Sequence, residues 1–234
     1  MRGKSKVIAI IPARGGSKRI PEKNIKDFQG LPLIVYSINV ALQSKLFEKV
    51  VVSTDDEKIA SIARKYGATV PFLRPKELAD DFTGTNEVVN YTLMALKDQG
   101  EVYEYSCTIY ATAPFLQEKY LVKGLDMLKN STAIHAFSAT SMPFPFQRTF
   151  KVNNQGRCEM FFPEHYHTRS QDLEVAYQDA GQFYWTKINE TSNNILFGKD
   201  SIPVILPRHL VQDIDTMEDW LHAELMFEVL QRKK

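Results

Sequence analysis

Short apolar runs rich in β-branched residues alternate along this chain with longer segments in which apolar residues recur every three or four positions. The short runs predict strands, because buried strands of a parallel sheet are nearly continuous apolar stretches, and the longer segments predict amphipathic helices. Strands are expected at residues 7–11, 49–53, 69–72, 106–110, 133–139 and 203–206. Helices are expected at residues 31–44, 57–66, 87–97 and 117–129, and again after residue 216. This alternation predicts an α/β fold with a mostly parallel sheet flanked by helices.

The segment from residue 142 to residue 166 interrupts the alternation, because it carries many aromatic residues and prolines with little periodicity. Within it, the sequence Asn-Asn-Gln-Gly at residues 153–156 is typical of a hairpin turn. Exposed aromatic hairpins commonly bury themselves against a partner. We therefore expect a small arm at residues 141–180, inserted within a single domain that spans residues 1–234.

The composition limits what kind of protein this is. With 234 residues, of which 44% are hydrophobic, the chain can build one sizeable α/β domain. Its 29 Lys and Arg against 28 Asp and Glu give a net charge of +1, so no overall field favours nucleic acid or a membrane as partner. Cys107 and Cys158 form no C-x-x-C pair, which is typical of reduced thiols. The apolar run at residues 7–11 is too short for a secretory signal or a membrane span, so we expect a soluble cytoplasmic protein.

A basic loop directly follows the first expected strand. Between residues 14 and 26 a single acid, Glu22, stands against five bases, which are Arg14, Lys18, Arg19, Lys23 and Lys26. Gly15 and Gly16 can adopt positive φ and allow backbone N–H groups to approach a ligand, while Ser17 and Asn24 add uncharged donors. Together these groups predict a binding site for a polyphosphate.

The position of this loop distinguishes it from an ordinary solvated basic loop, which charge alone would favour. A buried strand that leads into a Gly-rich turn lies where open α/β sheets bind nucleotides, outside the carboxyl ends of their strands. The loop contains neither G-x-x-x-x-G-K-[ST] nor G-x-G-x-x-G. The sequence therefore favours a nucleotide site that is neither a P-loop nor a classical dinucleotide fingerprint.

The loop sequence PARGGSKRIPEKN resembles the signature of sugar-activating cytidylyltransferases, specifically the CMP-acylneuraminate synthetase family, with its P-A-R-x-x-S-K-x-x-x-x-K-N pattern. The resemblance extends from about residue 6 to about residue 230, and the segment SQDLEVAYQDAGQFYW is most similar to the branch that activates pseudaminic acid. It implies a Rossmann-like nucleotide-diphospho-sugar transferase fold and a homodimer formed through the arm. It also implies that CTP reacts with a nine-carbon 2-keto sugar acid, with Mg²⁺ as cofactor, to give a CMP-sugar and pyrophosphate.

The resemblance also implies roles for individual residues. The nucleotide would contact Ala13, Arg14, Gly15, Ser17, Lys18, Lys23, Asn24, Arg74 and Thr85. Catalysis would depend on Arg14, Lys23 and Asp215. Purely structural alternatives exist for two of these positions, since Arg74 could pair with Glu77 at the surface and Thr85 could cap a helix. Asp56 is expected to cap the helix that follows it, whereas Asp55 fits a cap and a nucleotide site equally well.

Asp213 and Asp215 form a D-x-D pattern after the last expected strand. In an extended segment residues i and i+2 point to the same face, so both carboxylates can reach one cation. Mg²⁺ is bound in this way, by one or two carboxylates together with substrate phosphates. From the residues alone, charges placed favourably at a helix start explain the pattern equally well, and the family resemblance favours the metal. Thr216 and Asp219 form a capping box for the C-terminal helix.

The expected sugar site departs from the sialic acid branch of the family. Sialic acid synthetases have Gln-Pro-Thr-Ser-Pro where this chain has Tyr-Ala-Thr-Ala-Pro at residues 110–114, so an amide that contacts the sugar is missing. Losing its paired donor and acceptor predicts a less polar sugar. The resemblance assigns the sugar to Tyr110, Thr112, Arg148 and Gln178, although Gln178 replaces an arginine of the family and Arg148 fits an ordinary surface arginine equally well.

Three alternatives remain open. The same reaction on N-acetylneuraminic or legionaminic acid differs only in the sugar. A Kdo cytidylyltransferase is disfavoured, since its loop typically reads S-x-R-L-P-G-K-P where this chain has SKRIPEKN. A nucleotide-binding module without turnover is disfavoured, because the loop cations, the Arg74 segment and the D-x-D pattern occur together.

Overall fold

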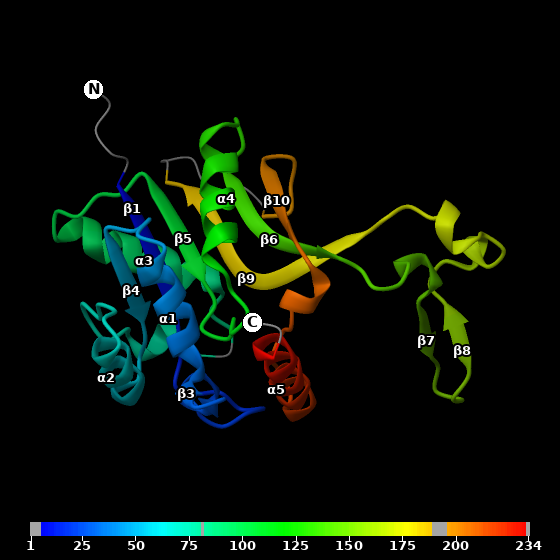
Figure 1. Cartoon of the computed structure of the whole chain (residues 1–234), viewed down its shortest axis with the longest axis horizontal. Helices are drawn as coiled ribbons and strands as arrows, with labels where there is room; N and C mark the ends of the chain where they lie inside the picture. The colour runs from blue at the N-terminus through cyan, green and yellow to red at the C-terminus, as the bar shows by residue number, and fades with distance from the viewer. Residues whose placement is uncertain (1–5, 81, 189–195, 233–234) are drawn as a thin grey trace.

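The computed structural model describes residues 6–80, 82–188 and 196–232, and its centre is a six-stranded sheet (Figure 1). The strand order is β10-β6-β9-β5-β1-β4, and all six strands run in the same direction except β9. The sheet strands are β1 (Val7–Pro12), β4 (Lys49–Ser53), β5 (Tyr105–Ile109), β6 (His135–Ser141), β9 (Tyr177–Lys187) and β10 (Ser201–Leu206). Two small hairpins pair β2 (Asp27–Phe28) with β3 (Leu31–Pro32) and β7 (Phe150–Val152) with β8 (Cys158–Met160).

Helices cover both faces of the sheet. The α-helices of the described residues are α1 (Leu33–Gln43), α2 (Glu57–Lys65), α3 (Thr85–Asp98), α4 (Glu118–Lys129) and α5 (Met217–Gln231). Short 3₁₀ turns occur at Lys23–Ile25, Lys76–Leu78, Phe146–Arg148, Pro163–His165, Ser170–Asp172 and Arg208–Leu210. The buried side chains of α1, α2 and α4 share one hydrophobic cluster, while those of α3 belong to a cluster on the opposite face.

The side-chain alternation along β1 accounts for these two helix layers. Ala9 and Ile11 belong to the cluster under α1, α2 and α4, whereas Ile8 and Ile10 pack with α3. These four side chains are fully buried. Because a strand covered on both faces needs apolar side chains at every position, the unbroken apolar run of β1 follows from its central place in the sheet.

Helix α5 packs on the loop that follows β1. Phe28 of β2 contacts Trp220 of α5 edge-to-face, with ring centroids 5.4 Å apart, and Ile20 and Ile214 are buried in the same cluster. This small second core brings the start of the chain beside residues 213–215. It therefore holds the basic loop and the D-x-D segment together, although almost 200 residues separate them in sequence.

An arm extends from the sheet between the end of β6 and the start of β9, and it carries the β7–β8 hairpin (Figure 1). Several large apolar side chains of this segment are exposed, among them Phe144 (77%), Phe150 (56%) and Phe161 (57%). Burying aromatic side chains is favourable, so the exposed side chains of the arm leave stabilising burial unused in a single chain.

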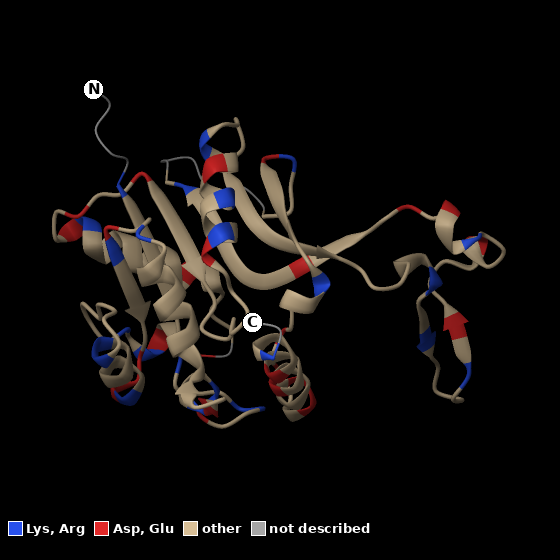
Figure 2. Cartoon of the chain, viewed as in Figure 1, with Lys and Arg blue, Asp and Glu red and all other residues tan. Residues whose placement is uncertain are grey.

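Most of the expected elements agree with the structure to within a few residues. The strand expected at residues 69–72 is wrong, because only Thr69 forms an isolated bridge, with Val51. Pro71 has no N–H group with which to extend that pairing. The long antiparallel strand β9 had not been expected. Charged residues lie mainly on helices and loops (Figure 2), and no described helix is long and apolar enough to cross a membrane.

Candidate active site

A cavity of about 400 Å³ opens at the sheet edge where β1 and β5 end. Its volume lies within the range of roughly 300 to 1,000 Å³ that small-molecule sites occupy. The residues that line it come from five parts of the chain and are Pro12, Ala13, Arg14, Ser17, Lys18, Arg19, Ile20, Lys23, Asn24, Arg74, Leu78, Asp80, Thr83, Thr85, Val88, Tyr110, Ala111, Thr112, Asp213 and Asp215. Most of the sequence-predicted site residues are thus brought together in one place.

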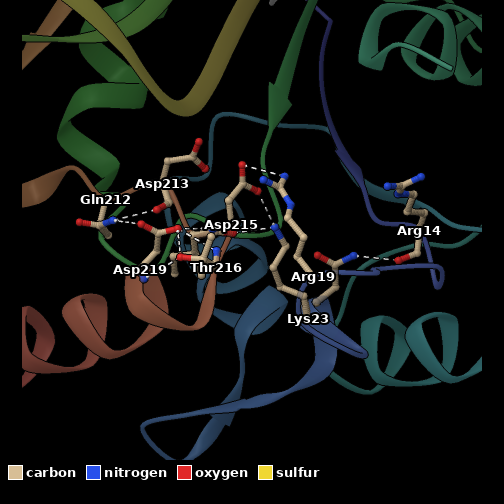
Figure 3. Close-up of polar contacts among 10 residues, drawn as sticks. Arg14, Arg19, Lys23, Gln212, Asp213, Asp215, Thr216 and Asp219 are labelled. Carbon is tan, nitrogen blue, oxygen red and sulfur yellow. Dashed lines mark hydrogen bonds and ion pairs between the residues drawn. The ribbon is translucent and has the colours of Figure 1, made fainter. Parts of the chain in front are cut away.

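The basic loop is held to its neighbours by backbone contacts. Ala13 N–H donates to the Ser53 carbonyl oxygen at 3.0 Å, so the loop leaves the sheet beside the end of β4. The Asn24 amide Nδ2 donates to the Arg14 carbonyl oxygen at 3.0 Å and closes the loop on itself (Figure 3). The Arg14 guanidinium donates to the Asp80 carbonyl oxygen at 2.7 Å. These contacts connect the first loop to the segment after β4.

Gly15 is required for close packing rather than for an unusual backbone conformation. Neither Gly15 nor Gly16 adopts positive φ, contrary to the expectation from the sequence. A Cβ atom at Gly15 would instead lie 2.6 Å from Asp56 Oδ2 and 2.9 Å from Asp56 Cβ. Asp56 cannot easily move, since its carboxylate accepts from the N–H groups of Lys58 and Ile59 and caps α2, as expected.

Arg74 lies inside the protein, with 5% of its surface exposed, and it faces Asp55, which rules out the alternative of a surface pair with Glu77. Its guanidinium faces Asp55, with 3.6 Å between Nη2 and Oδ1, and Asp55 also accepts from Gly15 N–H at 3.2 Å. Burial lowers the pKa of Arg74, the Asp55 carboxylate opposes this, and the Arg14 charge lowers it further. Arg74 Nε has no hydrogen-bond partner within the protein. A buried donor at the cavity wall is a group that an anionic or carbonyl-bearing ligand can satisfy.

Lys23 connects the basic loop to the D-x-D segment. Its ammonium donates to the Ile214 carbonyl oxygen at 2.6 Å and to Asp215 Oδ1 at 3.1 Å (Figure 3). Arg19 Nη2 lies 2.9 Å from the other oxygen, Asp215 Oδ2. Asp215 is therefore fixed between two cations, and one of them, Arg19, was not among the residues assigned to the site from the sequence.

Asp213 and Asp215 point to the same side of their loop, as Figure 3 shows. Partial loss of water raises the pKa of Asp213, and the nearby Asp215 carboxylate raises it further, whereas Lys23 lowers it. A divalent cation between the two carboxylates would relieve this repulsion. No group of three or more His, Cys, Asp or Glu side chains suited to a metal occurs among the described residues. The pair therefore fits Mg²⁺ only with further oxygen ligands from a substrate, which is the usual arrangement for this ion.

The start of α5 positions this carboxylate pair. Thr216 and Asp219 form the expected capping box, in which Thr216 Oγ1 accepts from Asp219 N–H at 3.2 Å. Asp219 Oδ2 accepts from Thr216 N–H at 2.7 Å and from Asp215 N–H at 3.1 Å. These bonds lower the pKa of Asp219 and orient the backbone that carries Asp215. Thr216 and Asp219 thus position the backbone of Asp215 and do not line the cavity themselves.

Tyr110 and Thr112, which follow β5, also line the cavity. The Tyr110 hydroxyl lies 3.5 Å from Thr85 Oγ1, and its ring lies 5.2 Å from the ring of Tyr184. Thr85 is the first residue of α3, and Gly84 occupies the N-cap position. Of the two alternatives for Thr85, the N-cap is therefore displaced by one residue to Gly84, and Thr85 lines the cavity.

Two residues assigned to the sugar lie outside the cavity of their own chain. Arg148 is an exposed residue of the arm and donates to the Thr168 carbonyl oxygen. Gln178 is exposed on β9, opposite Thr140 of β6. Conversely, Asp80 and Thr83 line the cavity but had not been assigned to it, although they belong to a loop rich in acids and hydroxyl groups.

Comparison with known proteins gives these features a context. A family model described as cytidylyltransferase matches residues 8–203. The pseudaminic acid cytidylyltransferase of Campylobacter jejuni is 44% identical over 225 residues, which cover 96% of this chain and 97% of that protein. The CMP-N,N'-diacetyllegionaminic acid synthase of Legionella pneumophila is 31% identical and covers 97% and 98% of the two chains. A solved CMP-2-keto-3-deoxy-manno-octonic acid synthetase with CTP has a TM-score of 0.67 at 16% identity, over 96% of this chain and 99% of that one.

Proposed function

The chain belongs to the cytidylyltransferase family, and from this premise we propose that it transfers CMP from CTP to pseudaminic acid and releases pyrophosphate. The observation that carries the proposal is the cavity at the carboxyl edge of the sheet. It combines a pair of carboxylates with five basic side chains, which are Arg14, Lys18, Arg19, Lys23 and Arg74. Such a wall complements a triphosphate, because cations and backbone donors aimed at phosphate oxygens supply most of the catalysis of phosphoryl transfer.

The basic loop would hold the triphosphate of CTP. Arg14 and Lys18 line the cavity and carry the charge, and the buried Arg74 Nε offers a donor that the protein leaves unpaired. Ser17 lines the cavity as a neutral donor, whereas the Asn24 amide supports the loop through the Arg14 carbonyl. Binding the phosphates from several sides would orient the α-phosphorus toward the sugar hydroxyl that attacks it.

Asp213 and Asp215 would hold Mg²⁺ together with phosphate oxygens. When bound, this ion neutralises charge on the phosphoryl oxygens and on the departing pyrophosphate. Lys23 keeps the Asp215 carboxylate at the cavity through the 3.1 Å contact with Oδ1. Asp215 lines the cavity and is our candidate to accept the proton of the attacking hydroxyl.

Replacing either carboxylate by its amide tests the proposed metal site. We expect Asp213→Asn and Asp215→Asn to lose most of the Mg²⁺-dependent rate, because an amide oxygen carries no charge for the ion. The measurement is the rate as a function of Mg²⁺ concentration, with Asp98→Asn at the exposed end of α3, outside the cavity, as the matched control. An unchanged Mg²⁺ titration in both variants would assign the ion to other ligands.

The proposal includes a homodimer in which the arm of one copy reaches the cavity of the other. Its support is the exposed aromatic surface of the arm and the position of Arg148 and Gln178 outside their own cavity. In a dimer these two residues could contact the sugar bound by the partner. Because CTP is a nucleotide of the cytoplasm, we place the reaction there.

Pyrophosphate release with CTP and Mg²⁺ tests both the chemistry and the substrate. The acceptors to compare are pseudaminic, N,N'-diacetyllegionaminic, N-acetylneuraminic and Kdo acids. We expect release with pseudaminic acid, at least about tenfold faster than with the others. Equal release with N-acetylneuraminic acid would contradict the role of Tyr110 in selecting the sugar, and CTP binding without release from any acid would contradict the proposed reaction.

A further inference from the structure

The Asp215 carboxylate contacts a different cation with each of its two oxygen atoms (Figure 3). Oδ1 accepts from the Lys23 ammonium at 3.1 Å, and Oδ2 lies 2.9 Å from Arg19 Nη2. A Mg²⁺ ion would lie about 2 Å from the oxygen that binds it, so it would share that oxygen with a positive charge. Because two such charges repel each other, the ion binds more easily if one of the two cations leaves.

Arg19 is held much less firmly than Lys23. The Lys23 side chain is 18% exposed, and its ammonium also donates to the Ile214 carbonyl oxygen at 2.6 Å. The Arg19 side chain is 65% exposed, and its guanidinium has no second ion pair or hydrogen bond within the part of the chain that the structure describes. An exposed ion pair of this kind is weak, because water screens it and the long side chain loses conformational freedom. Arg19 is therefore the cation that can leave Asp215.

The cavity offers Arg19 another partner when it leaves the carboxylate. Arg19 lines the same cavity as Arg14 and Lys18, so a triphosphate bound there lies within the space that its long side chain borders. A guanidinium binds phosphate oxygens through parallel N–H donors, a geometry that an ammonium cannot reproduce. The signature pattern of the loop leaves position 19 open, so this role is not part of the motif itself.

We propose that Arg19 is an exchangeable partner of Asp215. It pairs with the carboxylate in the free enzyme, gives way to the divalent ion that enters with CTP, and then binds the phosphates that leave as pyrophosphate. This assignment rests on the proposed function, because it takes Mg²⁺ and CTP as the ligands of the cavity. Asp215 keeps a positive partner at every stage. Arg19 thus opposes binding of the metal alone and favours binding of metal and CTP together, which is a coupling between the two ligands.

Metal binding without nucleotide tests the first half of this exchange. Mn²⁺ replaces Mg²⁺ as the probe, because electron paramagnetic resonance measures its free concentration directly. We expect Arg19→Gln to bind Mn²⁺ at least about threefold more tightly than the wild-type protein, since Asp215 Oδ2 is released. Arg19→Lys keeps the charge and should bind Mn²⁺ like the wild type. The matched control is Arg64→Gln, which breaks another exposed arginine–carboxylate pair outside the cavity and should change nothing.

CTP binding measured by calorimetry without any sugar acid tests the second half. With Mg²⁺ present, Arg19→Gln should weaken CTP binding at least about tenfold, because the phosphates lose a guanidinium partner. With EDTA in place of Mg²⁺ the loss should be less than about twofold, because Arg19 then stays on Asp215 in the wild-type protein. Arg19→Lys should lie between the two, since an ammonium supplies the charge without the paired donors. A residue that only stabilised the loop would weaken the binding of both ligands or of neither.

The two measurements separate this inference from the proposed function, because neither needs turnover. An Arg19→Gln variant that binds Mn²⁺ no more tightly than the wild type would overturn the exchange. A loss of CTP affinity that is equal with Mg²⁺ and with EDTA would overturn it as well. If Arg19→Gln shows both expected effects but the wild-type protein converts no sugar acid, the proposed function fails and the exchange at Asp215 stands.

Discussion

Arg14 has two separate roles, because its backbone stabilises the loop and its side chain lines the cavity. Its guanidinium reaches the Asp80 carbonyl across the mouth of the cavity, and its backbone carbonyl receives the Asn24 amide. The backbone contact is independent of the side chain, so truncating Arg14 removes charge from the cavity without releasing the loop. The functional and structural parts of this residue can therefore be separated by mutation.

Arg14→Ala should lower kcat by about 100- to 1,000-fold, the usual cost of removing one donor that stabilises a developing charge. The thermal unfolding midpoint should change by less than a few degrees, because the Asn24 contact remains. Steady-state kinetics and a thermal melt measure the two effects. Arg64→Ala, which removes an exposed partner of Glu57 on α2, is the control and should retain its rate. Near-normal turnover in Arg14→Ala would show that this side chain does not act on the triphosphate.

Gly15 must lack a side chain because Asp56, which caps α2, occupies the space where a Cβ atom would lie. The added Cβ in Gly15→Ala would press on the Asp56 carboxylate that caps α2. We expect a loss of about 1 kcal/mol in unfolding free energy, the typical value of an N-cap, and weaker CTP binding. In Gly15→Ala/Asp56→Gly both clashing atoms of residue 56 are gone, so the double variant should be more stable than the sum of the two single losses predicts. Additive losses in denaturant unfolding would contradict the clash.

At the scale of elements, the start of β4 is tied to the turn that precedes β5. Lys49 Nζ lies 2.6 Å from both carboxylate oxygens of Glu101, and the Tyr103 hydroxyl donates to Glu101 Oε2 at 2.6 Å. The hydrogen bonds from Lys49 and Tyr103 lower the pKa of Glu101, while burial and the same carboxylate raise the pKa of Tyr103. The cluster lies at the edge of the sheet away from the cavity, so it affects stability without touching the site.

The direction of the Glu101 shift determines how stability depends on pH. A carboxyl group whose pKa is lower in the folded state stabilises the fold above its unfolded pKa, about 4.3, and loses this effect as pH falls through the folded value. Glu101→Gln should therefore cost roughly 0.5 to 1 kcal/mol at pH 7, after allowing for solvent at a partly exposed pair. Below about pH 4 the variant and the wild-type protein should approach equal stability. Urea unfolding at several pH values measures this, and a difference that stays constant down to pH 3 would refute the assignment.

On the scale of the whole molecule, the arm projects away from the sheet (Figure 1). Its hairpin has two strands of three residues each, and its aromatic side chains face the solvent. Two-stranded hairpins are marginal in water, and an exposed apolar surface of this kind favours association. In the proposed dimer the exposed aromatic side chains of the arm would pack against the partner. The arm would then lie over the basic cavity of that partner.

The double variant Phe144→Ser/Phe161→Ser should shift the protein toward a monomer. Removing two exposed aromatic anchors should weaken the dimer at least about 100-fold, in line with the size of interface hot spots. Light scattering over a concentration series measures the change, with Met94→Ser on α3 as the control. If the arm completes the partner's site, the sugar KM should rise in parallel with dissociation. A wild-type protein that is already monomeric at high concentration would contradict the dimer.

The sequence by itself determined the features that depend on neighbours along the chain. Periodicity predicted the α/β rhythm, the capping box placed the start of α5, and the loop signature together with the D-x-D pattern indicated a nucleotide site. Such features are local, because a helix, a cap or a motif needs only a few adjacent residues. Most of the residues assigned to the nucleotide belong to one loop, residues 13–24, so a local pattern was sufficient to group them.

Only the tertiary structure decided which distant residues meet. Lys23 and Asp215 are 192 positions apart, yet they share an ion pair because α5 packs on the loop after β1. The burial of Arg74, the clash that requires Gly15 and the antiparallel course of β9 all depend on packing between separate elements. A second cavity, of about 140 Å³ under α3, is lined by residues of β5, β6 and β9, which are far apart in sequence. A pattern along the chain cannot specify such contacts, because the free energy of packing is shared among residues that only the fold brings together.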